Sequence, residues 1–401
     1  MSAPIARLEE LTEFILDGTH GSPIRTEFGV PVLSAQNVAN GVLDYYSDRY
    51  TSEKEFAAFN KRVSIRRNDV LLTIVGTIGR AAVVQDVQPA VFQRSVAIIR
   101  PNGKALDSRY LFHITQSPDF IEQARKFTKQ STQAGIYLGS LKKLEIPLPP
   151  LDEQKRIAAI LDQADHLRQK RRHAIALLDS LTQSIFLQMF GSMEPEELKW
   201  PTVPLSDLVQ EFRYGTSEKS QPEGHPTLRI PNVVGGSISL ADLKYVPVND
   251  RELNRLRLRE GDIFFVRTNG NKEYVGRSAV VTSEIERQSG YSVSDFIYAS
   301  YLIKARVKLE KLNSHFLQSF LSGPAGRKML LERAKTSAGQ YNINIEGLGS
   351  LRIPLPPLEQ QKNFESRATE ITHHMNLACE QLRTLSTLFS ALQHRAFSGQ
   401  L

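Results

Sequence analysis

Two long stretches of the chain, residues 151–190 and 358–397, repeat apolar side chains at helical spacing and contain neither Gly nor Pro. In the second stretch the apolar positions alternate steps of four and three residues over about five heptads, which is typical of a coiled-coil helix. These positions are Phe364, Ala368, Ile371, Met375, Ala378, Leu382, Leu385, Phe389, Leu392 and Ala396. The pattern predicts a long helix with one side packed against another helix.

The first stretch has the same pattern with polar interruptions in its middle. Its aligned positions are Ile157, Leu161, Ala164, Arg168, Arg171, Ile175, Leu178, Thr182, Ile185 and Met189. We expect the two helices to pair with each other. The main candidates for pairing are Ile157, Leu161, Ile175, Leu178 and Ile185, with Phe364, Ile371, Leu382, Leu385 and Leu392. Such seams normally reflect helix packing without chemistry, so the two helices are interpreted as a spacer and assembly element.

Both stretches belong to an internal repeat. The hexapeptide Ile-Pro-Leu-Pro-Pro-Leu at 146–151 returns at 353–358, and a Gln follows each copy three residues later. Upstream, Gly18-Thr19 corresponds to Gly215-Thr216. Because proline lacks an amide donor and restricts the residue before it, each helix begins only after its proline-rich hinge. The predicted organisation is a globular domain at 1–150, a helix at 151–191, a second globular domain at 192–357 and a second helix at 358–401.

The globular halves read as mixtures of strands and helices. Short runs rich in β-branched residues, bounded by Gly, Asn or Asp, predict strands. These runs lie at 69–75, 81–84, 96–99, 262–266 and 278–281, and helical stretches follow at 108–117, 118–129 and 313–335. The predicted fold class is α+β, with two tandem-repeated mixed α/β domains separated by two long helices. Antiparallel pairing about a pseudo-two-fold axis sends equivalent domains to opposite ends, whereas parallel pairing crowds them at one end.

Composition narrows the class of protein. With 41% hydrophobic and 23% charged residues the chain is expected to be globular. No uncharged stretch is long enough to cross a membrane, and the first residues lack a signal-peptide pattern. Cys379 is the only cysteine, which excludes an intrachain disulfide and favours a reducing cytoplasm. The net charge of +7 and pI near 9.3 permit nucleic-acid binding without requiring it.

Motifs for catalysis are missing from the sequence. It contains no phosphate-binding loop, no glycine-rich dinucleotide fingerprint after a strand, and no Asn/Asp-Pro-Pro-aromatic tetrapeptide of the amino-methyltransferases. The adjacent His373 and His374 lie on one predicted helix and cannot both face one metal ion. We therefore expect no catalytic residue, no metal site and no cofactor in this chain.

Polar loops that follow predicted strands carry the remaining chemical signal. Arg, Asn, Gln and Thr are side chains that read base edges, and glycine lets the backbone approach a phosphate. The candidate DNA contacts of the first half are Thr19, His20, Thr73, Thr77, Arg80, Gln93, Arg94, Gln130, Thr132 and Gln133. Those of the second half are Thr216, Lys219, Arg267, Thr268, Asn269, Asn271, Lys272, Arg277, Gln340, Tyr341 and Asn342. A solvated turn explains any one loop equally well, but similar placement with different residues points to two DNA readers of different specificity.

With its repeated Ile-Pro-Leu-Pro-Pro-Leu-x-x-Gln signature, the chain resembles the specificity subunits of type I restriction-modification systems over about residues 5–401. The resemblance implies two target-recognition domains that read a split, asymmetric site in double-stranded DNA, held apart by the paired helices. It also implies that these helices dock two modification subunits, which carry S-adenosylmethionine. Restriction subunits that use ATP and Mg²⁺ join the complex. The chain is then a non-catalytic subunit that the methyltransferase and endonuclease activities require. One departure is Asn68-Asp69, where the second half has the more usual Gly261-Asp262.

Other interpretations remain open on the residues alone. The chain could be a stand-alone sequence-specific DNA-binding protein, a specificity subunit of a methyltransferase-only system, a single-chain enzyme of the same lineage, or a coiled-coil scaffold without a DNA role. Co-purification with a methyltransferase-sized partner separates the main interpretation from the first and the last of these. Salt-sensitive DNA binding separates a DNA-binding protein from a scaffold.

Overall fold

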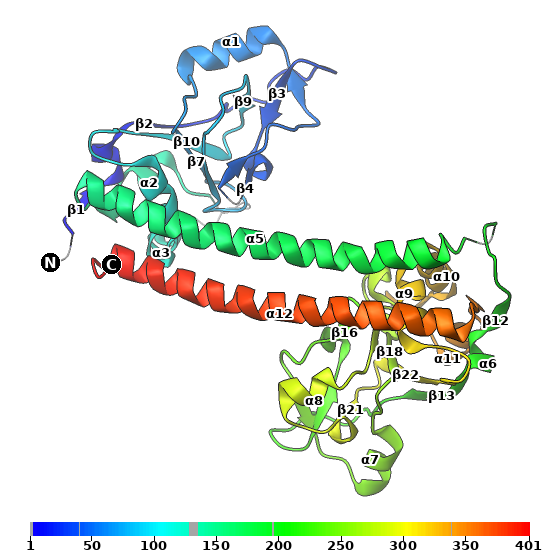
Figure 1. The fold of residues 1–401 in the computed structure, drawn as a ribbon. Helices are drawn as coiled ribbons and strands as arrows, with labels where there is room; N and C mark the ends of the chain where they lie inside the picture. Colours follow the sequence, from blue (N-terminus) through cyan, green and yellow to red (C-terminus); the bar gives the residue numbers. More distant parts are fainter. Residues whose placement is uncertain (1–2, 40, 128–134, 195, 338) are drawn as a thin grey trace. The chain divides into compact units, whose positions relative to one another are not determined.

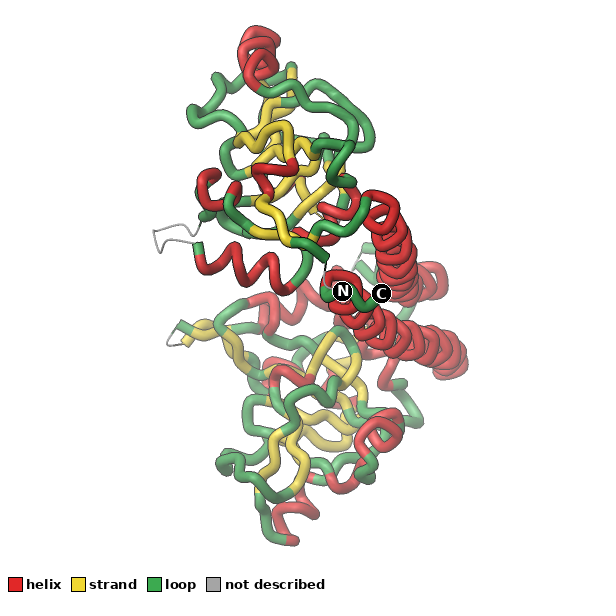
Figure 2. Tube along the Cα trace, turned by 90° about the vertical axis from the view of Figure 1, so that its left-hand side faces the viewer, coloured by secondary structure: helices red, strands yellow, loops and turns green. Residues whose placement is uncertain are grey.

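The computed structural model describes residues 3–39, 41–127, 135–194, 196–337 and 339–401 (Figures 1 and 2). The chain divides into two compact units. The first unit is Met1–Arg172 with Glu380–Leu401, and the second unit is His173–Cys379. Strands gather in the interior of each unit, with helices and loops around them (Figure 2). The candidate residues Gln130, Thr132 and Gln133 lie outside the described residues.

The first unit is built on a four-stranded antiparallel sheet of order β2-β10-β7-β8. Its strands are β2 (Thr12–Asp17), β10 (Val96–Pro101), β7 (Val70–Thr73) and β8 (Ala81–Val83). A smaller sheet joins β6 (Tyr50–Thr51), β3 (Val30–Leu33) and β9 (Val91–Phe92). Two short pairs join β1 (Ile5–Arg7) to β11 (Glu145–Pro147) and β4 (Val38–Ala39) to β5 (Val42–Leu43). The helices are α1 (Glu53–Arg62), α2 (Ser108–Thr115), α3 (Pro118–Lys126) and α4 (Leu138–Lys142). The three strands predicted for this half are confirmed.

The second unit repeats this design in the sheet order β13-β22-β18-β20. Its strands are β13 (Val209–Tyr214), β22 (Leu302–Val307), β18 (Ile263–Val266) and β20 (Ser278–Val280). One three-stranded sheet joins β17 (Lys244–Val246), β14 (His225–Leu228) and β21 (Ile297–Tyr298), and another joins β19 (Thr268–Asn269), β24 (Gln340–Asn342) and β23 (Lys335–Ser337). Two short pairs join β12 (Thr202–Pro204) to β25 (Arg352–Pro354) and β15 (Val233–Val234) to β16 (Ser237–Ile238). The equivalent sheet orders confirm the internal repeat and the α+β fold class.

The helices of the second unit correct one prediction. They are α6 (Leu205–Leu208), α7 (Asp250–Leu256), α8 (Glu284–Ser289), α9 (Ser314–Ser322), α10 (Pro324–Arg333) and α11 (Ile345–Gly349). The stretch 313–335 was expected to be helical throughout, but α9 ends before Gly323 and α10 begins at Pro324. Proline has no N–H to continue the first helix but is well suited to the first position of a new one.

The two long helices are α5 (Leu151–Phe190) and α12 (Leu358–Phe397), and each contributes to both units. In the first unit, Ile157 and Leu161 near the start of α5 share a core with Phe389 near the end of α12. In the second unit, Phe186 near the end of α5 packs on Phe364 near the start of α12, with ring centroids 5.4 Å apart. The helices therefore run antiparallel within each unit (Figure 1).

The predicted seam follows the buried side of these helices. Among the candidate pairing residues, Ile157, Leu161, Phe364 and Ile371 are buried. The others are half-buried: Ile175, Leu178, Ile185, Leu382, Leu385 and Leu392. Arg168, one of the polar interruptions, places its guanidinium 4.3 Å from the centre of the Phe389 ring. Burial lowers the pKa of Arg168. By stacking on this ring, the Arg168 side chain occupies its position in the helix seam despite its charge.

A buried glutamine joins each globular part to its helix. Gln154 accepts the N–H of Asp107 at 2.9 Å and donates to the carbonyls of Ala105 and Pro149, each at 2.9 Å. In the second unit Gln361 accepts the N–H of Asn313 at 2.8 Å. It donates to the carbonyls of Lys311 at 3.4 Å and Pro356 at 2.8 Å. This shared set of bonds explains physically why a Gln follows each hinge.

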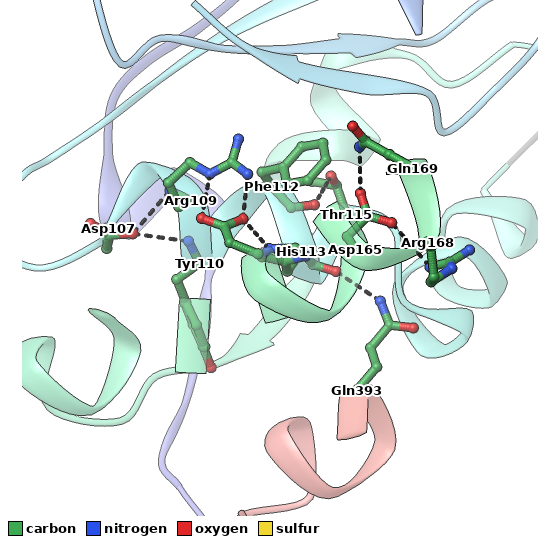
Figure 3. Close-up of polar contacts among 11 residues, drawn as sticks. Asp107, Arg109, Tyr110, Phe112, His113, Thr115, Asp165, Arg168, Gln169 and Gln393 are labelled. Atoms are coloured by element: carbon green, nitrogen blue, oxygen red, sulfur yellow. Dashed lines mark hydrogen bonds and ion pairs between the residues drawn. The ribbon is translucent and has the colours of Figure 1, made fainter. Parts of the chain in front are cut away.

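We call the packing of α2 on α5 and α12 the first junction (Figure 3). Asp162 of α5 accepts hydrogen bonds from Arg109 Nε at 3.0 Å and from Arg109 Nη2, and lies 2.7 Å from His113 Nε2. From α12, Gln393 donates to the carbonyl of His113 at 3.2 Å. Polar groups of both long helices therefore hold α2. The equivalent packing of α9 in the second unit is the second junction.

Candidate nucleic-acid interface

The loops predicted to bind DNA in the first half meet at one edge of their unit. The N–H of Thr19 donates to the carbonyl of Phe92 at 2.7 Å, and the N–H of Arg94 donates to the carbonyl of Thr19 at 3.2 Å. Close by in the chain, the N–H of Ile74 donates to the carbonyl of Ser95 at 2.9 Å. Gly18 is needed for this approach, because a Cβ there would lie 2.1 Å from the carbonyl oxygen of Phe92.

The second unit brings its predicted loops together in the same way. The N–H of Ser300 donates to the carbonyl of Thr216 at 2.7 Å, and the N–H of Arg267 donates to the carbonyl of Tyr301 at 2.9 Å. Strand β19, at Thr268–Asn269, pairs antiparallel with β24, which holds Gln340, Tyr341 and Asn342. We call these meeting loops the reading face of each unit.

Some candidate side chains hold the reading faces together internally. Thr73 is fully buried, and its hydroxyl accepts the N–H of Arg80 at 2.9 Å. The buried Thr216 accepts the N–H of Glu218 at 3.1 Å. Thr268, also buried, donates to Gln340 Oε1 at 2.9 Å. These three hydroxyls are therefore engaged in shaping the loops.

The other candidates are exposed or half-buried. The exposed ones are His20, Thr77, Arg80, Arg94, Lys219, Asn271, Lys272 and Gln340. The half-buried ones are Thr19, Gln93, Arg267, Asn269, Arg277, Tyr341 and Asn342. His20 lies 3.2 Å from Asp17, so it is partly engaged within the unit. Exposed cations can contact phosphates, and exposed amides can contact base edges.

The loop after β19 combines a defined turn with available donors. Asn269 Oδ1 accepts the N–H of Asn271 at 2.9 Å, and Asn271 Oδ1 accepts the N–H of Glu273 at 3.0 Å. These bonds use the side-chain oxygens and fix the direction of both amides. The NH₂ groups take no part in them, and an ordered amide donor suits recognition of a base edge.

The comparisons with known proteins agree on one family. The sequence model described as "Type I restriction modification DNA specificity domain" matches residues 24–177. The EcoKI specificity subunit of Escherichia coli strain K12 is 25% identical, with 93% of this chain and 82% of that protein covered. The StySPI specificity subunit of Salmonella potsdam is 23% identical over the same shares. The chain is therefore similar to type I restriction-modification specificity subunits over most of its length.

Solved structures support the same fold for this chain. The type I restriction-modification S subunit from M. genitalium superposes with a TM-score of 0.60 at 14% identity, covering 98% of this chain and 96% of that one. A chain from a structural study of type I complex assembly and conformational transition superposes with a TM-score of 0.50 at 16% identity, covering 100% and 98%. At these identities the likeness concerns the fold alone.

The departure at Asn68 has a conformational explanation. Asn68 and Gly261 both have positive φ, at 71° and 86°. Asn tolerates this left-handed region better than most residues with a side chain. The next residue, Asp69, accepts two hydrogen bonds at 2.8 Å from the guanidinium of Arg100. The equivalent pair in the second unit, Asp262 and Arg306, has bonds of 2.8 and 2.7 Å. Both residue types therefore support the same buried ion pair.

Exposed aromatic residues near the reading face were missed in the sequence. Tyr301 is 58% exposed and Tyr274 is 40% exposed. The Arg277 guanidinium lies 4.1 Å from the centre of the Tyr274 ring, and that of Arg267 lies 4.8 Å from the centre of the Tyr214 ring. For Tyr274, the signal that could have found it is a tyrosine within a few residues of the predicted basic contacts Lys272 and Arg277.

Two further features are missing from the described part of the chain. Within it, no group of three or more His, Cys, Asp or Glu side chains is arranged to hold a metal ion. Its helices also include none that is long and apolar enough to span a bilayer.

Proposed function

We propose that this chain is a specificity subunit that reads a bipartite, asymmetric target in double-stranded DNA. One half-site is assigned to each reading face. The observation that carries this proposal is the same loop framework built twice with different side chains. At equivalent places after the central strand, the first face presents Thr77 and Arg80, and the second presents Asn269, Asn271 and Lys272. Different donors on a common framework give different base preferences.

The same proposal assigns the outer sides of the long helices to modification subunits. In the second unit Leu177 and Leu181 are 55% and 43% exposed and lie one helical turn apart on α5. In the first unit Leu388 of α12 is 50% exposed. Exposed leucines on a charged helix suit a protein partner. The internal repeat supports two partner copies, because equivalent surfaces occur twice.

Chemistry is assigned to the partners in this proposal. The modification subunits supply S-adenosylmethionine, the restriction subunits supply ATP and Mg²⁺, and this chain supplies recognition without catalysis. The complex is proposed to act in the cytoplasm, where it meets chromosomal and invading DNA.

A domain exchange tests the assignment of half-sites. Residues 1–145 are replaced by the corresponding domain of a relative with a known target, and the chimera is co-expressed with the modification subunits. Methylome sequencing should then show one changed half-site and one retained half-site. Replacement of the second globular domain should give the opposite result. A chimera that methylates with both half-sites changed, or with neither changed, contradicts the proposal.

A further inference from the structure

A cavity of about 340 Å³ lies inside the second unit, against the second junction. Its walls come from the end of α5, the start of α12, the α9 helix and the β15–β16 turn. Phe186, Ile285, Phe320 and Met375 supply much of its apolar surface. No candidate DNA contact lies among its described lining residues, so the cavity is separate from the reading face.

The internal repeat identifies the residues of the first unit that correspond to this cavity. The hinge glutamines set the register, because Gln154 bonds the N–H of Asp107 where Gln361 bonds that of Asn313. In this register His113 of α2 corresponds to Ser319 of α9. On the long helices, Arg168 corresponds to Met375, Phe389 to Thr182, and Leu161 to Ala368.

The first unit fills the corresponding place with large side chains. The Phe389 ring lies 4.3 Å from the Arg168 guanidinium and has its centroid 6.2 Å from that of the His113 ring. Leu161 is completely buried beside them in the same core. Figure 3 shows His113 and Arg168 on the helices that surround this place.

In the second unit all four counterparts are smaller, and all four line the cavity. They are Thr182, Ser319, Ala368 and Met375. The cavity therefore lies where the other copy of the fold holds an aromatic ring against a histidine. A space of this size would leave its apolar lining short of contacts unless something fills it.

We propose that this cavity binds a planar, uncharged heteroaromatic molecule in the position that the Phe389 ring occupies in the first unit. Phe186 and Met375 offer apolar contact to the faces of a ring, and Gln318 and Asn376 offer hydrogen bonds to its edge. A pocket with mostly apolar walls and a few polar groups is typical of small-molecule sites.

The charges around the cavity exclude an acidic ligand. Its described lining residues contain no Lys or Arg, but they include Asp179 and Glu284. Burial lowers the pKa of His315, although Glu365 at 3.9 Å opposes that change. His315 is therefore neutral near pH 7 and does not supply a positive charge. A carboxylate placed here would lose its hydration without gaining a cationic partner.

Calorimetric titration of the full-length chain with indole tests the proposal without DNA or partner subunits. Indole should bind at one saturable site. At ten times its dissociation constant it should raise the unfolding temperature by about 3–6 °C. Indole-3-carboxylate, which adds a negative charge to the same ring, should bind at least about tenfold more weakly. Absence of saturable indole binding to the unmodified chain overturns the proposal.

Variants of the cavity assign the site. Thr182→Phe restores the ring of the first unit and should abolish indole binding, whereas Thr182→Ser, at the same position, should retain it. Ala368→Leu copies Leu161 and provides a second way to fill the cavity if Thr182→Phe does not fold. A folded cavity-filling variant that binds indole as tightly as the unmodified chain places the indole elsewhere and overturns the assignment.

Discussion

Both junctions contain an aromatic pair, but the first adds charges and hydrogen bonds and the second adds further aromatic rings. In the first, Asp162 bonds both Arg109 and His113 of α2. In the second, Phe316 of α9 lies 5.7 Å from Phe186 and 5.0 Å from Phe190, measured between ring centroids. Gln393 of the first junction corresponds to Phe186 of the second, so a hydrogen bond to α2 in one copy is replaced by aromatic packing on α9 in the other.

This difference shows what the repeat preserves and what it leaves variable. The hinge, the buried glutamine and the Asp–Arg pair occur in both units with nearly the same distances. Several of the side chains that pack the globular part against the helices differ between the two units. Apolar burial has little dependence on pH, whereas a carboxylate that accepts charged hydrogen bonds depends on its protonation state. We expect the two junctions to respond differently to mutation and to acid.

The largest effect is expected from Phe316→Ala in the second junction. Phe316 is completely buried, and truncating a buried phenylalanine costs about 3–5 kcal/mol of unfolding free energy. Chemical denaturation of the full chain should show this loss, and Phe316→Leu, which keeps most of the volume, should lose much less. A cost below about 1 kcal/mol for Phe316→Ala would mean that the ring cluster is not the main support of this junction.

A smaller effect is expected from Asp162→Asn in the first junction. The amide keeps the shape of the side chain but loses the charge that Arg109 and His113 bond, so the unfolding free energy should fall by about 1–3 kcal/mol. Asp119→Asn, on α3 of the same unit, provides a control with the same chemical change outside the junction. Equal effects of the two substitutions would show that the charge of Asp162 has no particular role.

Acid should distinguish the two junctions. Although burial alone would raise it, hydrogen bonds from His113 and Arg109 hold the pKa of Asp162 below its usual value. Asp165 and His166 line the same hollow. The stabilisation is fully present above the unfolded-state pKa of about 3.9 and is lost as the pH falls through the folded-state pKa.

Denaturation measured between about pH 6 and pH 3 tests this dependence. The pH dependence of stability should be weaker for Asp162→Asn than for the unmodified chain, because the variant has no carboxylate to protonate there. Phe316→Leu should keep the slope of the unmodified chain. An unchanged slope for Asp162→Asn would assign the acid sensitivity to other carboxylates.

The smallest effect concerns the reading faces. Asn269→Ala removes one ordered amide and should relax one base position of the second half-site by about 1 kcal/mol of discrimination. Lys272→Ala should weaken binding to all sequences similarly and lower the salt dependence by about one counterion. Methylation sequencing and salt-dependent binding measure the two effects. A change in the first half-site would show that the faces do not act separately.

Local patterns predicted most of the architecture because the governing interactions are local or repeated. The heptad seam, the proline hinges and the β-branched runs each depend on neighbours within a few residues. The division between α9 and α10 is also readable from Gly323-Pro324, because proline cannot continue a helix but suits the start of a new one. For the candidate site, the sequence named loops that the structure brings together within each unit.

The sequence could not separate the buried hydroxyls from the exposed donors. Thr73 ends strand β7 and Thr77 lies four residues later in the loop that follows, yet only Thr73 is buried and bonded to the backbone. This difference depends on the tertiary position of Arg80, whose N–H bonds the Thr73 hydroxyl. The cavity could not be predicted from the sequence either, because Thr182, Ser319 and Met375 come together from three different helices. Such features arise from tertiary contacts and leave no periodic signal.

The hinge glutamines have a consequence for how such proteins change over evolutionary time. Gln154 and Gln361 bond only to main-chain N–H and carbonyl groups of the domains they fasten. Every amino acid except proline offers both groups, so this joint is indifferent to the side chains of the attached domain. A gene segment encoding a foreign domain can then be recombined behind the hinge without redesign of the attachment. Under the proposed function, such an exchange changes one half of the DNA target in one genetic step, while the long helices are inherited unchanged.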